Sequence, residues 1–112
     1  MKLITDALRA QLPNLGDTEG IPLTSKVAYV KYFTPDSNWT WYACEFDGQD
    51  TFFGYVQGMD SEWGYFSLEE LSWVRGPLGL SIERDLSFTP QPIAPYLKTF
   101  DANESDLWDR QG

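Results

Sequence analysis

Apolar residues along the first twelve positions recur with the spacing of an α-helix. One helical face carries five of them: Leu3, Ile4, Ala7, Leu8 and Leu12. Pro13 ends this pattern, and residues 13–25 contain two prolines and two glycines, which is typical of a loop. The pattern therefore predicts an amphipathic N-terminal helix followed by a long loop.

The next part of the chain alternates with the period of two that is typical of β-strands. Residues 26–33 predict one strand, and residues 39–46 and 51–56 predict a hairpin closed by residues 47–50. Asp-Gly in this turn suits either a two-residue or a four-residue loop. Because both loops have even length, they predict the same side chains on one face: Tyr42, Cys44, Phe46, Thr51, Phe53 and Tyr55. The other face is also aromatic, so the hairpin is either covered on both sides or leaves one side as a binding surface.

The pattern after this hairpin predicts a turn at 58–64 and a short strand at 65–66. Ser67 and Glu70 match a capping box, in which each side chain bonds the backbone amide of the other residue. A second helix is therefore expected after Ser67, ended by Gly-Pro at 76–77.

The remaining residues predict a fourth strand at 82–88, a helical turn at 96–100 and a short acidic segment at 103–112. Together these patterns predict a single α+β domain over residues 1–112. Its mainly antiparallel sheet of about four strands carries the N-terminal helix and the second helix after Ser67.

The composition excludes several kinds of chemistry. The 112 residues include no histidine and a single cysteine, Cys44. Zinc fingers, His-dependent nucleophilic catalysis, haem ligation by histidine and an intrachain disulfide are therefore excluded. The acidic turns do not match a calcium-binding loop, so we predict no cofactor and no metal site. The first twelve residues lack the continuous apolar run of a secretory signal, and no run is long enough to span a membrane, so we expect a cytoplasmic protein with no membrane contact.

The chain is strongly acidic, with eight Lys and Arg against seventeen Asp and Glu and a formal net charge of −9. No Lys or Arg occurs from residue 32 to residue 74, a window that holds eight carboxylates: Asp36, Glu45, Asp47, Asp50, Asp60, Glu62, Glu69 and Glu70. Direct nucleic-acid binding needs cations that displace counterions, so we do not expect it. The acidity indicates either a protein kept soluble by its charge or an acidic surface that meets a basic partner.

The charge density decides what such a surface could imitate. B-DNA carries one charge per about 1.7 Å of axis, or about one per 110 Å² of a cylinder roughly 20 Å across. Nine net charges over an expected surface of roughly 6,300 Å² give only about one per 700 Å². DNA mimicry therefore requires the acidic residues of the window to gather in one patch.

Two other interpretations of the window stay open. Carboxylates from neighbouring turns could form the acid–base pair of a small hydrolase, although turn carboxylates are usually solvated whereas a general acid needs burial. The aromatic residues of the hairpin could instead bind a neutral small ligand or a peptide. A deep apolar pocket beside Trp39, Trp41 or Trp63 would favour that second interpretation.

Several motifs between Lys31 and Ile93 carry a resemblance to a known family. They are NWTWY at 38–42, EFDG at 45–48, GYFSL at 64–68 and RGPLGL at 75–80. On these motifs the chain resembles a small bacterial family, domain-of-unknown-function family 2958. The resemblance implies no catalytic residues. It does imply genes that are often carried on plasmids, phages and conjugative elements, near anti-restriction and transfer genes.

Charge and resemblance together predict a non-enzymatic, acidic interaction protein of a mobile element. We expect it to bind and inhibit a host nucleic-acid-handling defence complex, of CRISPR or restriction type, by presenting a DNA-like negative surface. Its partner is then a basic host protein or nucleoprotein complex. The predicted contact residues are Asp36, Asp47, Asp50, Asp60, Glu62 and Trp63. The alternative is a small-ligand or peptide-binding module that uses the aromatic hairpin face.

Overall fold

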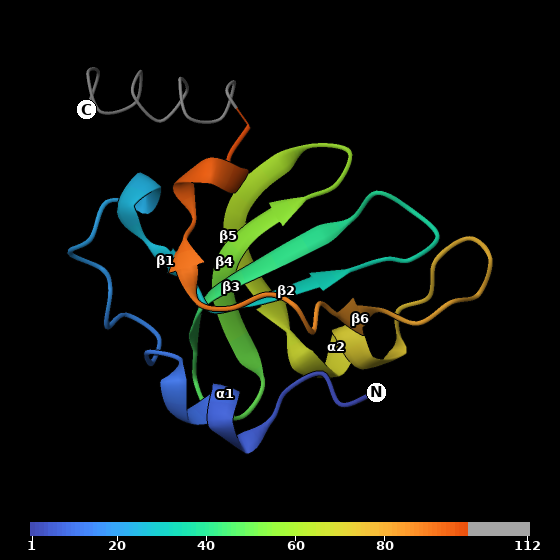
Figure 1. The fold of residues 1–112 in the computed structure, drawn as a ribbon, viewed down its shortest axis with the longest axis horizontal. Coiled ribbons are helices and arrows are strands. Elements are labelled where there is room, and N and C mark those ends of the chain that lie inside the picture. The colour runs from blue at the N-terminus through green and yellow to red at the C-terminus, as the bar shows by residue number, and fades with distance from the viewer. Residues whose placement is uncertain (99–112) are drawn as a thin grey trace.

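An antiparallel sheet of five strands forms the centre of the molecule in the computed structural model, which describes residues 1–98 (Figure 1). The strands lie in the order β5-β4-β3-β2-β6, with these bounds: β2 Val30–Phe33, β3 Thr40–Phe46, β4 Thr51–Gln57, β5 Ser61–Ser67 and β6 Glu83–Arg84. A separate two-stranded sheet pairs β1 (Val27–Ala28) with β7 (Gln91–Pro92). The predicted α+β class is confirmed, with five strands in the main sheet rather than about four.

Both predicted α-helices are present, and a hydroxyl side chain marks the start of each. Thr5 caps α1 (Asp6–Gln11) by accepting a hydrogen bond from the Leu8 amide at 3.1 Å. Ser67 caps α2 (Leu68–Trp73) by accepting one from the Glu70 amide at 3.2 Å. The predicted start of the second helix is therefore confirmed.

Two short 3-10 helices lie in the connecting segments, η1 (Leu23–Ser25) and η2 (Ala94–Tyr96). The helical turn predicted at 96–100 was wrong in position, because η2 ends at Tyr96 and Leu97 is extended. Residues 99 and 100 of that prediction, and the acidic segment predicted at 103–112, lie outside the described residues.

Both faces of the main sheet pack against other parts of the chain. On one face, which we call the helical face, side chains from the sheet, the helices and the N-terminal segment form the larger core cluster: Ile4, Leu12, Val30, Tyr32, Trp41, Ala43, Phe46, Phe52, Leu71 and Ile82. On the other face, which we call the β1 face, a smaller cluster forms around Ala28, Tyr42, Tyr55 and Ile93. This smaller cluster covers only part of the β1 face, because Tyr65 on β5 is 71% exposed.

A β-bulge at Cys44 changes the predicted facing of the hairpin. Ala43 lies opposite Gly54, but Glu45 lies opposite Phe53, so Cys44 is an extra residue in β3. Phe46 therefore joins Phe52 on the helical face, at a ring separation of 4.3 Å, rather than sharing a face with Phe53. Of the two loop lengths left open by the sequence, the structure has the four-residue loop, whereas the shared face predicted beyond Cys44 was wrong.

Three predicted strands were also wrong in extent. The single strand predicted at 26–33 is divided into β1 and β2, which belong to different sheets. β5 begins at Ser61 rather than at residue 65, because the glycine at 64 sits in the ladder opposite Gly54 and does not mark a turn. β6 ends at Arg84 because the Asp85 side chain accepts a hydrogen bond from the Ser87 amide and turns the chain. Phe88 is thereby brought against the smaller cluster on the β1 face.

Candidate functional site

The five carboxylates among the predicted contact residues are divided between the two ends of the main sheet. Successive hairpins reverse the chain, so the β2–β3 and β4–β5 turns lie at one end and the β3–β4 turn lies at the other (Figure 1). We call the first the Trp39 end and the second the Asp50 end. Strands of seven residues separate the two ends by about 20 Å. The Trp39 end holds Asp36, Asp60 and Glu62, and the Asp50 end holds Asp47 and Asp50.

At the Asp50 end, both predicted carboxylates are hydrogen-bonded by the chain itself. One Asp47 oxygen accepts hydrogen bonds from the amides of Gln49, Asp50 and Thr51, at 2.8, 2.8 and 3.0 Å. These amide bonds, led by the one from Gln49, lower the pKa of Asp47. The Asp47 carboxylate therefore holds the hairpin turn in place.

Asp50 extends the cap of α2. Its carboxylate accepts hydrogen bonds from the Ser67 hydroxyl at 2.8 Å and the Glu69 amide at 2.8 Å. Its backbone carbonyl accepts one from the Leu68 amide at 2.8 Å. The hairpin turn and the start of the helix are thus tied together, and the negative charge lies where the helix dipole favours it.

At the Trp39 end, Asp36 is also bonded internally. One of its oxygens accepts hydrogen bonds from the amides of Leu78 and Leu80, at 2.8 and 3.4 Å, while the other is buried without a hydrogen-bond partner among the described residues. A Cβ atom added to Gly76 would lie 1.7 Å from that buried oxygen, so only glycine leaves room for the carboxylate. Asp36 therefore fastens the loop at 76–80 to the β2–β3 turn.

Asp60 and Glu62 differ from these three acids. Both are exposed, and neither forms a hydrogen bond through its side chain or an ion pair with any residue of the described part of the chain. Arg75 is exposed nearby on the loop after α2, but its guanidinium donates to the backbone carbonyls of Ser72 and Val74. Two carboxylates at this end are consequently available to a partner.

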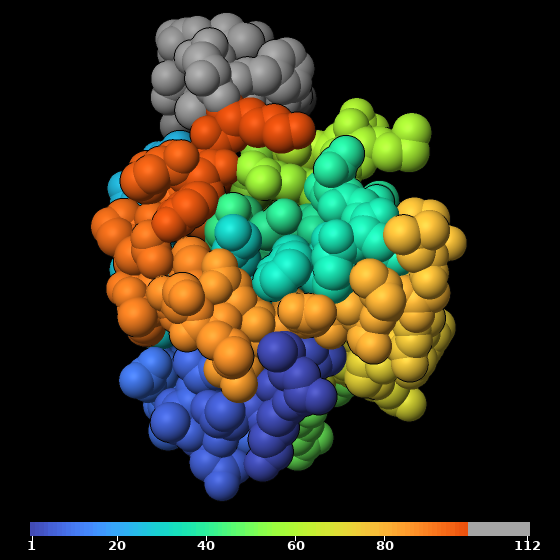
Figure 2. Space-filling view, turned by 45° about the vertical axis from the view of Figure 1, so that its right-hand side comes forward, coloured from blue at the N-terminus to red at the C-terminus, as the bar shows by residue number. Residues whose placement is uncertain are grey.

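Exposed apolar side chains accompany these carboxylates. The Trp39 ring stacks on Trp41 at 5.9 Å, lies against Gly58 of the β4–β5 turn, and is still 40% exposed. Met59 is 92% exposed and Leu78 is 79% exposed. Figure 2 shows the two turns and the loop at 76–80 gathered on one side of the molecule. Such clustering of apolar residues on a surface marks an interaction site.

A cavity of about 330 Å³ opens beside the stacked tryptophans. Its walls come from the β2–β3 hairpin and from the segment after α2: Thr34, Ser37, Trp39, Trp41, Val74, Arg75, Gly76 and Pro77. The cavity is therefore lined by both indole rings at the Trp39 end of the sheet.

Trp63, the predicted anchor, packs inward instead. Its ring stacks on Phe53 at 5.9 Å and lies 5.2 Å from Tyr55, and it supports the smaller core cluster. Trp39 was predicted to lie beside a possible ligand pocket, whereas no role was predicted for Met59 or Leu78. The sequence does indicate that these two side chains are exposed, because both are large apolar residues in turns, which lie at the surface.

The remaining acid–base candidates are structural. Glu45 is buried and lies 4.0 Å from the Lys26 ammonium. Burial alone would raise the pKa of Glu45, but hydrogen bonds from Thr18 and Gly16 together with Lys26 lower it below its ordinary value. Burial raises the pKa of the Cys44 thiol to about 12, so this thiol is not activated.

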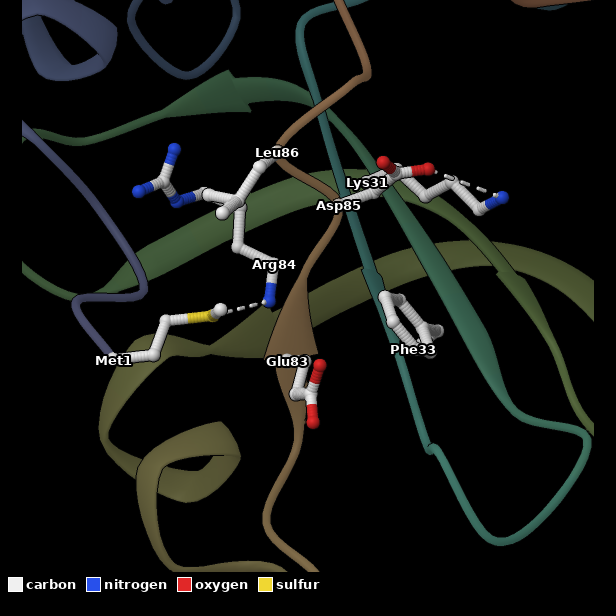
Figure 3. A pocket seen from close by; sticks show the side chains of 7 residues that line it. All are labelled: Met1, Lys31, Phe33, Glu83, Arg84, Asp85 and Leu86. Carbon is white, nitrogen blue, oxygen red and sulfur yellow. Dashed lines mark hydrogen bonds and ion pairs between the residues drawn. The ribbon is translucent and has the colours of Figure 1, made fainter.

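A further hollow of about 380 Å³ lies beside β6 (Figure 3). Lys31 pairs there with Asp85 at 3.6 Å, and the Arg84 amide donates to the Met1 sulfur at 3.2 Å. Two basic and two acidic side chains line this hollow, with Glu83 as the second acid. Its mixed charge gives it no preference for a basic partner.

No three His, Cys, Asp or Glu side chains in residues 1–98 gather closely enough to hold a metal ion. None of the helices in this part of the chain has the length and apolar composition needed to cross a bilayer.

Comparison with known proteins gives one finding. A family model described as "Protein of unknown function (DUF2958)" matches residues 3–106. Searches of curated proteins and of solved structures found no match.

Proposed function

This chain belongs to the DUF2958 family of proteins of unknown function, and from that premise we propose that it is a non-enzymatic, acidic interaction protein. It meets a basic protein surface through the Trp39 end of its sheet. The observation that supports this most directly is that Asp60 and Glu62, which have no ion-pair partner among residues 1–98, lie at the same end of the sheet as the exposed ring of Trp39.

The two kinds of side chain act at different stages of binding. The net charge of −9 and the free carboxylates steer a cationic partner toward this end, which raises the association rate and weakens with salt. Trp39 then anchors the complex, because a large aromatic ring at the centre of a small interface contributes more binding energy than the charges at its rim.

The partner class follows from charge and from the expected genetic context. A basic surface that normally handles nucleic acid offers the complementary charge, and a host defence complex of CRISPR or restriction type has such a surface. Bound at the Trp39 end, the protein blocks that surface in the cytoplasm. The contact we propose is local, because the five predicted carboxylates are divided between two ends of the sheet.

The experiment compares two variants with the same change in net charge. Immobilised wild-type protein is expected to retain a basic nucleic-acid-binding protein from bacterial lysate at low salt. Neutralising the Trp39 end with Asp60→Asn and Glu62→Gln is expected to abolish retention. Neutralising the Asp50 end with Glu69→Gln and Glu70→Gln is expected to preserve it. Equal retention by both double variants would overturn the proposal.

The cavity of about 330 Å³ beside Trp39 and Trp41 favours a second candidate, a module that binds a small apolar ligand or a peptide side chain. Tryptophan fluorescence separates the two candidates. Quenching or a blue shift on titration with small apolar probes, unchanged by salt and lost in Trp39→Ala, would support the ligand-binding module. Partner binding that falls with rising salt would support the interaction protein.

A further inference from the structure

One edge of the main sheet is open. β5 is the last strand of the order β5-β4-β3-β2-β6, and among residues 1–98 it pairs only with β4. None of its seven residues is buried. An edge strand of this length, exposed along its side, presents a row of unpaired backbone groups.

The hydrogen-bond pattern shows which groups these are. The Asp47 amide donates to the Thr51 carbonyl, so the backbone of Thr51 points toward β3. Alternation along β4 then turns the backbone of Phe52 and of every second residue after it toward β5. Their β5 partners are bonded to β4, which leaves the outward backbone groups of four residues: Ser61, Trp63, Tyr65 and Ser67. Ser67 also caps α2, so the open edge consists of the first three.

A groove of about 640 Å³ runs beside this edge on the β1 face. One wall is formed by Phe53 and Tyr65, and the other by apolar residues of the long loop: Leu15, Ile21, Pro22 and Leu23. Ile21 and Leu23 are partly exposed, as is Tyr65. A strand added at β5 would project every second side chain toward this groove.

The charged side chains at the floor of the groove, Lys26 and Glu45, already have partners within the chain. Lys26 donates to the Thr18 hydroxyl at 2.8 Å and lies 4.0 Å from Glu45, and Glu45 accepts hydrogen bonds from the loop amides of Gly16 and Thr18. These buried charges balance each other. The remaining charge on the groove wall is the exposed carboxylate of Glu19, so the groove favours a cation at its rim.

We propose that β5 receives an extended segment of another protein as a sixth strand of the sheet. The segment has about five to seven residues, with apolar side chains at alternate positions on the groove side and Lys or Arg on the opposite side, where it faces Glu62. Backbone hydrogen bonds to Ser61, Trp63 and Tyr65 supply affinity, and the groove supplies specificity. This site shares Glu62 with the Trp39 end, but its backbone contacts do not rest on the function proposed there.

A second copy of the chain is a poorer occupant of the same edge. Each chain carries a net charge of −9, so pairing two copies along β5 brings like charges together. A basic segment removes this repulsion.

The test selects peptides from a random library of 12-residue peptides displayed on phage, using the full-length protein as bait. Selected peptides are expected to alternate apolar and basic residues. Adding such a peptide should slow amide hydrogen exchange at Ser61, Trp63 and Tyr65, while Glu62 and Gly64 should already be slow without it. Failure to select any peptide, or protection confined to other segments, would overturn the proposal. Protection of the same three amides that grows with protein concentration, without peptide, would assign the edge to self-association instead.

A matched pair of variants tests the backbone contact itself. Tyr65→Pro removes an outward amide, and Tyr65→Val removes the same ring while keeping that amide. Peptide affinity is expected to be about tenfold weaker for Tyr65→Pro than for Tyr65→Val, because a buried peptide carbonyl loses its donor. Equal affinities would show that the ring, and not the strand edge, recognises the peptide. If Tyr65→Pro does not fold, the exchange pattern of the wild-type protein decides.

Discussion

At the Asp50 end of the sheet both predicted carboxylates accept hydrogen bonds from the chain itself, whereas at the Trp39 end Asp60 and Glu62 are exposed and have no partner within the described part of the chain. All four acids lie in or beside hairpin turns, where acidic residues are common. The two pairs differ in the number of backbone amides near them that can donate a hydrogen bond. The Asp50 end places a tight turn beside the start of α2, and both structures offer unpaired amides.

Apolar side chains are buried at the Asp50 end and exposed at the Trp39 end. At the Asp50 end, Phe46 and Phe52 are buried, and Arg9 of α1 lies over the Phe46 ring at 5.5 Å. At the Trp39 end, Met59 and Leu78 are more than three-quarters exposed. An acidic turn therefore indicates a contact site only where nearby amides do not already bind the carboxylate and nearby apolar groups remain uncovered.

The largest effect in this comparison is expected from Asp50→Ala. The Ser67 hydroxyl and the Glu69 amide would lose a charged acceptor, so the free energy of unfolding should fall by about 2 kcal/mol. Asp60→Ala is the matched control at the other end and should change it by less than about 0.5 kcal/mol. Urea denaturation of the two variants measures both values, and equal losses would contradict the assignment of Asp50 as a cap.

A smaller loss, about 1 kcal/mol, is expected from Asp36→Ala, because the Leu78 amide loses its 2.8 Å acceptor. The loop at 76–80 would also be released from the β2–β3 turn. Limited proteolysis should then cut this loop faster than in the wild-type protein, whereas Asp36→Asn, which keeps an acceptor oxygen, should be cut more slowly than Asp36→Ala. Cleavage at the wild-type rate in both variants would show that Asp36 does not hold the loop.

Features that depend on neighbouring residues could be predicted from the sequence, whereas the hydrogen bonds that hold the turn carboxylates could not. The antiparallel hairpin and the start of α2 at Ser67 depend on residues close together in the chain, and they were predicted. The bonds of Asp50 to Glu69 and of Asp36 to Leu78 join residues 19 and 42 positions apart. No local pattern shows that such distant amides will meet a turn carboxylate.

The bulge at Cys44 could not be predicted either, because it also depends on contacts between residues far apart in the chain. Strict alternation predicted Phe46 on the face of Phe53, but the inserted residue moves Glu45 to that face. On that face Glu45 lies beside Lys26 and accepts hydrogen bonds from the loop amides of Gly16 and Thr18. These two amides are 29 and 27 positions away along the chain. The bulge also requires Gly54, since an added Cβ would lie 1.8 Å from the Tyr42 carbonyl oxygen.

Neutralising the Trp39 end should leave the fold almost unchanged. The double variant Asp60→Asn, Glu62→Gln removes no hydrogen bond or ion pair of the described residues and relieves a little of the overall repulsion. Its free energy of unfolding should stay within about 0.5 kcal/mol of the wild-type value in urea denaturation. A larger loss would mean that these carboxylates are structural, as those at the Asp50 end are.

The smallest effect concerns Asp47 and appears only in acid. Amide hydrogen bonds lower its pKa in the folded state, so the unfolded chain binds this proton more readily. The resulting stabilisation is present above the ordinary pKa of about 4 and is lost as the pH falls through the lower pKa of the folded state. Asp47→Asn cannot titrate, so the stability difference between wild-type and variant should shrink between about pH 6 and about pH 2. Urea denaturation across this range measures that difference, and a constant value would show that the carboxylate charge at the turn contributes nothing.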